Sequence, residues 1–301
     1  MNRFAPLFII TAAILWGIDG IVLRPGLYTL PVALVVFIES TIVTVYLSPL
    51  LFKNIKIIKS LHRNDWLAFI GVAIFGGAIG IMSITKALFY VNYVNLSIVI
   101  LIQKLQPVFA LSLAAIVLKE RLPSKFFVWA SLAILGAYIM TFGIHLPKFD
   151  TGDKTLIAVM YALFAAFSFG VSTVLSKRAL RNVSFELGTY LRYIFSSIIM
   201  LILVLSFSQF GSVPYISGKQ WLIFLLIAFS TGGPAIFLYY YGLKNVTAST
   251  STILELAFPL TAIILEYLIH GKILDLVQWI GVFILIFSII MVTKLTQRRK
   301  N

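Results

Sequence analysis

The feature that most limits the fold of this chain is a series of about ten apolar stretches, each about 20 residues long. A helix rises 1.5 Å per residue, so about 20 residues cross a hydrocarbon core that is roughly 30 Å thick. Only 11% of the 301 residues are charged, against about 25% in a soluble domain. We therefore predict an all-α integral membrane protein with ten transmembrane helices, at residues 5–23, 31–52, 66–88, 95–118, 125–145, 155–176, 187–207, 220–242, 247–269 and 276–294.

Seven ionisable residues, four acids and three bases, lie within these stretches away from their end residues. A charged side chain costs at least about 2.5 kcal/mol at the centre of a bilayer, and such side chains usually pair or face a hydrated cavity. We therefore expect a polar cavity between the helices. The seven residues are Asp19, Glu39, Lys86, Lys104, Arg192, Glu255 and Glu266.

Basic residues outside the stretches predict the orientation of the chain, whose formal net charge is +14. If the N-terminus is cytoplasmic, sixteen Lys and Arg residues fall on the cytoplasmic side and five on the other, in agreement with the positive-inside rule. We expect both termini in the cytoplasm, and the protein in a plasma membrane or a bacterial inner membrane. Topology and the anionic headgroups of the lipid bilayer explain the basic surplus, so we expect no nucleic-acid partner.

The two halves of the sequence resemble each other at a nearly constant shift of 152 to 155 residues. Five stretches in each half, an odd number, would insert the second half upside down relative to the first. Inverted repeats of this kind place a binding site near the middle of the bilayer and permit alternating access. The corresponding pairs include Trp16-Gly17 with Phe169-Gly170, Glu39 with Arg192, Gly77 with Gly232, Gln103 with Glu255, and Pro107 with Pro259.

Several short motifs in this order resemble the EamA type of the drug/metabolite transporter superfamily. They are Trp16-Gly17, Gln106-Pro107-Val108-Phe109-Ala110 followed by Lys119-Glu120-Arg121-Leu122, and Phe258-Pro259-Leu260-Thr261-Ala262. The resemblance implies two five-helix repeats, here 1–147 and 148–301. It also implies a central cavity lined by helices 1, 3, 4, 6, 8 and 9 and, most often, export of amino acids or other small metabolites.

Two prolines mark the predicted substrate site. Pro107 and Pro259 fall in the middle of apolar stretches and cannot donate to the carbonyls of Gln103 and Glu255, four residues earlier. Irregular backbone within a membrane usually lines a cavity. We predict helix kinks at both prolines, although such kinks also occur where helices only pack together.

The predicted substrate-binding residues lie close to these kinks. Lys104 and Glu255 both fall near the middle of the bilayer, where they would form an ion pair or together hold a zwitterionic substrate. Gln103, Trp16 and Tyr239 add polar and aromatic surface, although a structural role in helix packing or at the membrane interface remains an alternative.

Four more ionisable residues are candidates for gating or proton coupling. Glu39 and Arg192 occupy corresponding repeat positions at different depths, so we expect them to be related by symmetry and not bonded to each other. Asp19 and Lys86 fall in the outer third of the membrane, where structural pairing is an equal alternative.

These patterns favour a secondary transporter of a small molecule that works by alternating access. A channel and a non-transporting sensor remain alternatives. A membrane-embedded enzyme is disfavoured, because a single aspartate lies within the apolar stretches and the three histidines lie only at or beyond their ends. The chain has no cysteine and only three, widely separated histidines, so we predict no metal and no cofactor.

Overall fold

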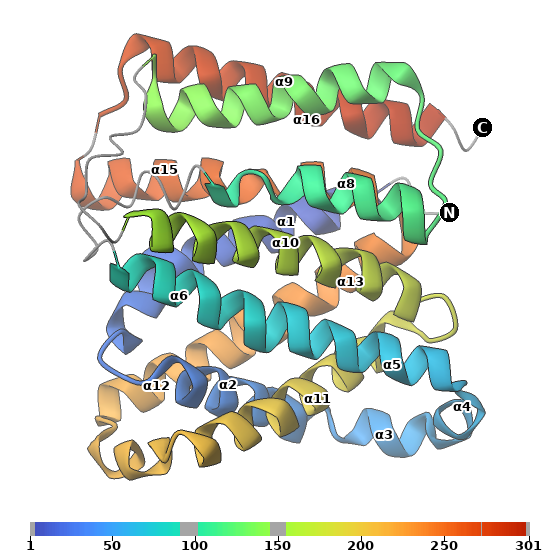
Figure 1. Ribbon diagram of the computed structural model, residues 1–301, viewed down its shortest axis with the longest axis vertical. Helices are drawn as coiled ribbons and strands as arrows, with labels where there is room; N and C mark the ends of the chain where they lie inside the picture. Colours follow the sequence, from blue (N-terminus) through green and yellow to red (C-terminus); the bar gives the residue numbers. More distant parts are fainter. Residues whose placement is uncertain (1–3, 91–101, 145–154, 272, 299–301) are drawn as a thin grey trace.

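The computed structural model describes residues 4–90, 102–144, 155–271 and 273–298, and every regular element within these ranges is helical. The longer helices run in roughly the same direction and lie side by side in stacked rows (Figure 1). This confirms the prediction of an all-helical protein.

The first half of the chain contains short and long helical elements. They are α1 (Ala5–Ile18), η1 (Asp19–Leu23), η2 (Arg24–Leu27), α2 (Val32–Leu47), α3 (Pro49–Lys53), α4 (Ile55–Ser60), α5 (Arg63–Val72), η3 (Ala73–Ile79), α6 (Gly80–Tyr90), α8 (Gln106–Val117) and α9 (Ser124–Phe142). The second half contains α10 (Thr155–Ala179), α11 (Phe185–Ser206), η4 (Gln209–Tyr215), α12 (Gly218–Ile227), η5 (Ala228–Gly232), α13 (Gly233–Asn245), α14 (Ala248–Leu254), α15 (Ala257–His270) and α16 (Leu276–Arg298).

Consecutive elements join into spans of membrane length. Within the described residues, 8 helices are long and apolar enough to cross a bilayer, and two shorter apolar helices are α2 and α8. All ten predicted stretches overlap one of these helices, so the protein is a multi-pass membrane protein. The predicted stretch at 95–118 lies partly outside the described residues, as does the predicted repeat boundary at 147 and 148.

The repeat seen in the sequence recurs in the bounds of the helices. α2 and α11 begin 153 residues apart, α5 and α12 begin 155 apart, and α9 and α16 begin 152 apart. The two π-helical segments, η3 and η5, also begin 155 residues apart. The same backbone irregularity therefore occurs at the same place in each half.

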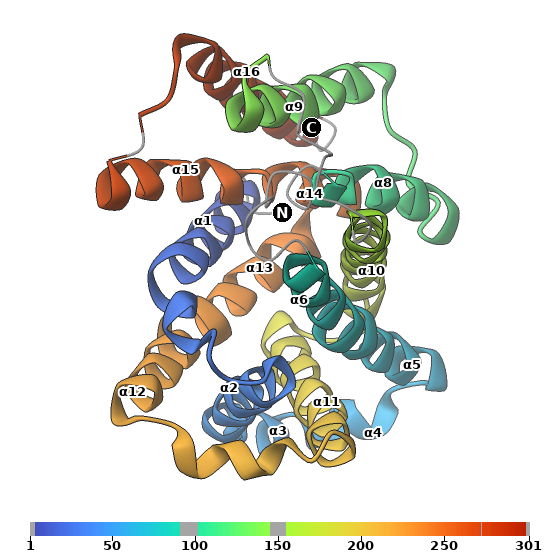
Figure 2. The ribbon, with the colours of Figure 1, turned by 60° about the vertical axis from the view of Figure 1, so that its left-hand side comes forward.

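Helices from the two halves pack directly against each other. α1 contacts α13 and α15, α2 contacts α11, and both α6 and α8 contact α10. α9 and α16 form a separate pair at one end of the molecule (Figure 2). The Glu120 carboxylate adds a polar link between the halves, because it accepts hydrogen bonds from the backbone N–H groups of Ala248 and Ser249 at the start of α14.

Two helices are interrupted next to the predicted prolines. Turns at Lys104-Leu105 and at Glu255-Leu256 precede α8 and α15, and Pro107 and Pro259 lie in the first turns of these helices. Proline is tolerated there because the first N–H groups of a helix have no partner within it. A short turn therefore interrupts the helix just before each proline, and a kink at the two prolines stays a prediction.

Candidate substrate-binding cavity

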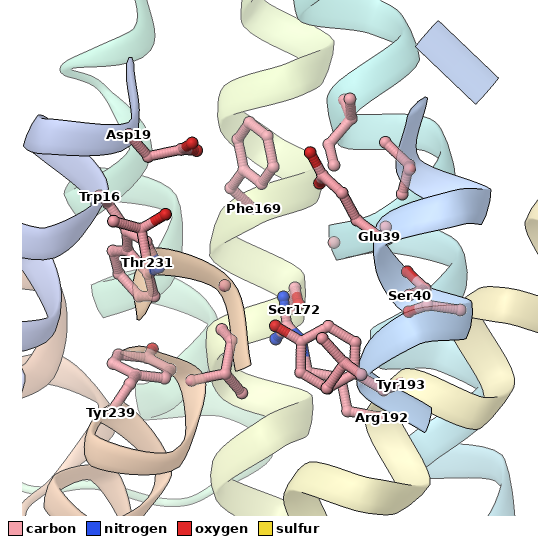
Figure 3. Close-up of a pocket in the computed structure, with 18 of the residues that line it drawn as sticks. Trp16, Asp19, Glu39, Ser40, Phe169, Ser172, Arg192, Tyr193, Thr231 and Tyr239 are labelled. Atoms are coloured by element: carbon pink, nitrogen blue, oxygen red, sulfur yellow. The ribbon is translucent and has the colours of Figure 1, made fainter. Parts of the chain in front are cut away.

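A cavity of about 390 Å³ lies between the two halves, within the range of about 300–1,000 Å³ usual for small-molecule sites. Helices of both repeats contribute to its wall, and Figure 3 shows the side chains that point into it. α2 and α11, which correspond to the second and seventh predicted helices, also line the cavity, in addition to the helices that the family resemblance implied. Its charged and aromatic lining residues are Asp19, Arg24, Glu39, Arg192, Glu255, Trp16, Phe169, Tyr193, Tyr239 and Phe258.

One arginine joins two carboxylates in the cavity wall. Nε of Arg24 donates to Oδ2 of Asp19 at 2.8 Å, and its Nη2 donates to Oε2 of Glu39 at 3.4 Å. Both carboxylate side chains are about nine-tenths buried, whereas the arginine side chain is 32% exposed. Since one cation faces two anions, this cluster has a formal charge of −1.

Glu255 is held by hydrogen-bond donors from three helices. Its Oε1 accepts from the Tyr239 hydroxyl at 2.8 Å and from the Ser251 hydroxyl at 3.1 Å, and its Oε2 accepts from Nε2 of Gln106 at 3.2 Å. The ring of Tyr239 lies against that of Trp16, with 5.2 Å between the ring centroids. Buried hydrogen bonds of this kind fix side-chain orientation, so Glu255 positions an aromatic wall of the cavity.

Arg192 lies at the same cavity but contacts tyrosine. Its Nη1 donates to the hydroxyl of Tyr240 at 3.5 Å, and its guanidinium lies 5.8 Å from the centroid of that ring. The Tyr240 hydroxyl also bonds the Ser176 hydroxyl at 3.0 Å. The ion pairs among the described residues at this cavity join Arg24 to Asp19 and to Glu39, and none joins Arg192 to Glu39.

The two predicted lysines are placed differently from the acids. Lys104 is buried but is not among the lining residues, and within the described part of the chain it forms no ion pair with Glu255. Lys86 is exposed and lies 5.6 Å from the ring centroid of Tyr161. For Lys104 the reason is the turn before α8, after which Gln103 and Gln106 line the cavity and Lys104 does not.

Sequence reasoning missed several lining residues. Arg24 lies just outside the predicted stretch at 5–23, but the Ala5–Leu27 span continues through η1 and η2 and brings its guanidinium back to Asp19. Phe169 could have been found, because it corresponds to Trp16 in the repeat. Several serine and threonine residues that line the cavity follow no pattern that would distinguish them in the sequence. They are Ser172, Thr173 and Ser176 on α10, Ser196 on α11 and Thr231 on η5.

An all-helical, multi-pass membrane protein with a polar cavity between two repeats has the architecture of a secondary transporter. The profile of the EamA-like transporter family matches residues 3–142 and 156–294, and the chain belongs to this family. It is therefore a membrane transporter with a small-molecule substrate, and not an enzyme.

Known relatives agree with the family. The chain is 46% identical over 290 residues to the riboflavin transporter ImpX of Fusobacterium nucleatum, which covers 96% of this chain and 97% of the relative. It is 27% identical to an uncharacterized transporter of Clostridium kluyveri over 86% of this chain and 82% of the relative. A crystal structure with 18% identity superposes over 100% of both chains with a TM-score of 0.79, which supports the fold.

Proposed function

We propose that this protein carries riboflavin across the membrane by alternating access. The proposal depends on the 46% identity, over nearly the whole of both chains, to the riboflavin transporter of Fusobacterium nucleatum. This relative favours a flavin over the amino acid or similar zwitterion that the mixed charges predicted.

The chemistry of the cavity supports a flavin. Riboflavin is uncharged at neutral pH and consists of a flat three-ring system and a chain of hydroxyl groups. Aromatic side chains from both halves offer faces on which a flat ring can stack, and Gln103, Gln106 and the hydroxyl-bearing residues offer hydrogen bonds. We propose that Trp16, Tyr239, Gln103 and Glu255 form the ring site.

Other predicted residues keep their proposed roles. Asp19, Glu39 and Arg192 line the cavity, and we propose that they act in gating or proton coupling. Lys104 and Lys86 do not line the cavity. Substrate binding by Lys104 and gating by Lys86 stay predictions.

The proposed mechanism requires an inverted repeat. We propose ten membrane crossings, which are the 8 long spans together with the two shorter helices α2 and α8. Both termini would then lie in the cytoplasm. Residues 1–147 and 148–301 would then form two five-helix repeats of opposite orientation. Rocking of one repeat against the other would expose the cavity to each side in turn.

Counterflow in proteoliposomes tests this function. Vesicles containing the purified full chain are loaded with labelled riboflavin, and unlabelled riboflavin is added outside. A carrier with one alternating site releases the label faster under these conditions, whereas a channel does not. Net efflux of riboflavin from cells with and without the protein separates export, the direction that the family resemblance implies, from uptake.

Two tryptophan variants provide a matched comparison. Trp16→Ala removes a ring from the cavity and should reduce riboflavin flux about tenfold, since ring stacking contributes about 1–3 kcal/mol. Trp279→Ala removes a half-exposed ring that does not line the cavity and should retain the flux. Absence of riboflavin flux in either direction with the unaltered chain would reject the proposal.

A further inference from the structure

Three buried polar atoms at the cavity have no hydrogen-bond partner among the described residues. They are Oδ1 of Asp19, Oε1 of Glu39 and Oγ1 of Thr231. Asp19 is 7% exposed and Thr231 is 3% exposed. Figure 3 shows Asp19 and Thr231 on one wall and Glu39 on the opposite wall. Because buried polar groups are normally paired, these atoms indicate where a ligand supplies the missing partners.

The partners that these atoms need are mostly donors. An ionised carboxylate only accepts hydrogen bonds, whereas a threonine hydroxyl both donates and accepts. Arg24 is already shared between the other oxygens of the two acids. The complementary ligand group therefore carries several hydroxyl donors spaced along a chain, which is the chemistry of a polyol.

We infer that Asp19, Glu39 and Thr231 form a subsite for the polyol chain of a flavin. The inference rests on the proposed function, and it orients the substrate: the hydroxyl chain lies at this cluster, and the ring lies toward Trp16 and Tyr239. Arg192 then faces the ring carbonyl groups, which are acceptors.

The negative charge of the cluster predicts selectivity against ligands that carry a phosphate group. Asp19, Glu39 and Arg24 have a formal charge of −1, and the single cation is already bonded to both acids. A phosphate group at the end of the polyol chain would be repelled there. The subsite therefore selects riboflavin over its phosphorylated form, flavin mononucleotide.

Equilibrium binding of three flavins to the purified full chain tests this inference. Lumiflavin has the same ring system with a methyl group in place of the polyol chain. Since a hydrogen bond to a charged group changes affinity by about tenfold or more, riboflavin should bind at least about tenfold more tightly than lumiflavin. Flavin mononucleotide should also bind at least about tenfold more weakly than riboflavin.

Matched variants assign the effect to the subsite. Thr231→Val should weaken riboflavin binding several-fold and leave lumiflavin binding unchanged. Thr252→Val is the control, because Thr252 Oγ1 is also buried without a partner but does not line the cavity. Glu39→Gln removes one negative charge and should reduce the difference in binding affinity between riboflavin and flavin mononucleotide.

Each outcome supports or rejects a separate claim. If the unaltered chain binds riboflavin and lumiflavin equally, or if Thr231→Val and Thr252→Val behave alike, the polyol subsite is rejected and the flavin function stands. If flavin mononucleotide binds as tightly as riboflavin, the orientation is wrong. If none of the three flavins binds, the proposed function itself fails.

Discussion

Arg24 controls the charge balance of the cavity at the level of single residues. It is the only basic residue within bonding distance of Asp19 and Glu39 in the described part of the chain. Without it, two largely buried carboxylates would face each other and the cavity with no compensating charge. Leaving one partner of a buried pair uncompensated costs about 3–5 kcal/mol, whereas an exposed pair contributes about 0–1 kcal/mol.

Arg24→Gln should therefore lower the free energy of unfolding by about 2 kcal/mol, between these limits because the arginine is one-third exposed. Thermal unfolding of the detergent-solubilised protein measures the change. Adding Asp19→Asn to Arg24→Gln should recover part of the loss, since it removes one of the two anions. An unfolding temperature equal to that of the unaltered protein would contradict this view of the cluster.

At the level of elements, α9 packs closely against α16, and glycines permit the approach. A Cβ atom added at Gly136 would lie 2.7 Å from the backbone nitrogen of Leu285 and 3.0 Å from the carbonyl oxygen of Gly281. A Cβ at Gly281 would overlap the backbone at Met140. Membrane helices lack a hydrophobic force between them and pack through such small residues.

Gly281→Ala should push α16 away from α9 and cost about 1–3 kcal/mol, even though alanine favours a helix by about 1 kcal/mol over glycine. Unfolding temperature and monodispersity in detergent report the effect. Gly218→Ala, at the start of α12, is the matched control because nothing lies within 4 Å of its added Cβ. Equal behaviour of the two variants would show that the α9–α16 contact tolerates a larger separation.

At the level of the whole molecule, alternating access requires that the cavity open to each side in turn. The chain contains no cysteine, so one introduced thiol reports access without any background. Ser196 lies on α11 in the cavity wall and is 5% exposed, whereas Ser206 lies at the exposed end of the same helix.

Ser196→Cys should react with a membrane-impermeant thiol reagent added from either side, and riboflavin should slow this reaction. Ser206→Cys should react from one side only, without protection by riboflavin. Labelling of right-side-out and inside-out vesicles measures both rates. Reaction of Ser196→Cys from one side alone, with or without riboflavin, would argue against an alternating cavity.

The sequence alone determined the membrane spans and the repeat, because both depend on local patterns. About 20 apolar residues are needed wherever a helix crosses lipid, and equivalent bounds recur at shifts of 152 to 155 residues. Trp16, Gln103, Tyr239 and Glu255 could be selected for the same reason: they are polar or aromatic residues at repeat or mid-span positions.

Only the tertiary structure decided which side chains meet. Hydropathy placed Arg24 in a loop, but the π-helical and 3-10 turns after α1 bring its guanidinium to Asp19 and Glu39. The mid-span position of Lys104 predicted that it binds substrate, yet with the turn before α8 its side chain does not line the cavity. Direction around a helix changes by about 100° per residue, so a single irregular turn reassigns a side chain, and no local pattern records where that turn occurs.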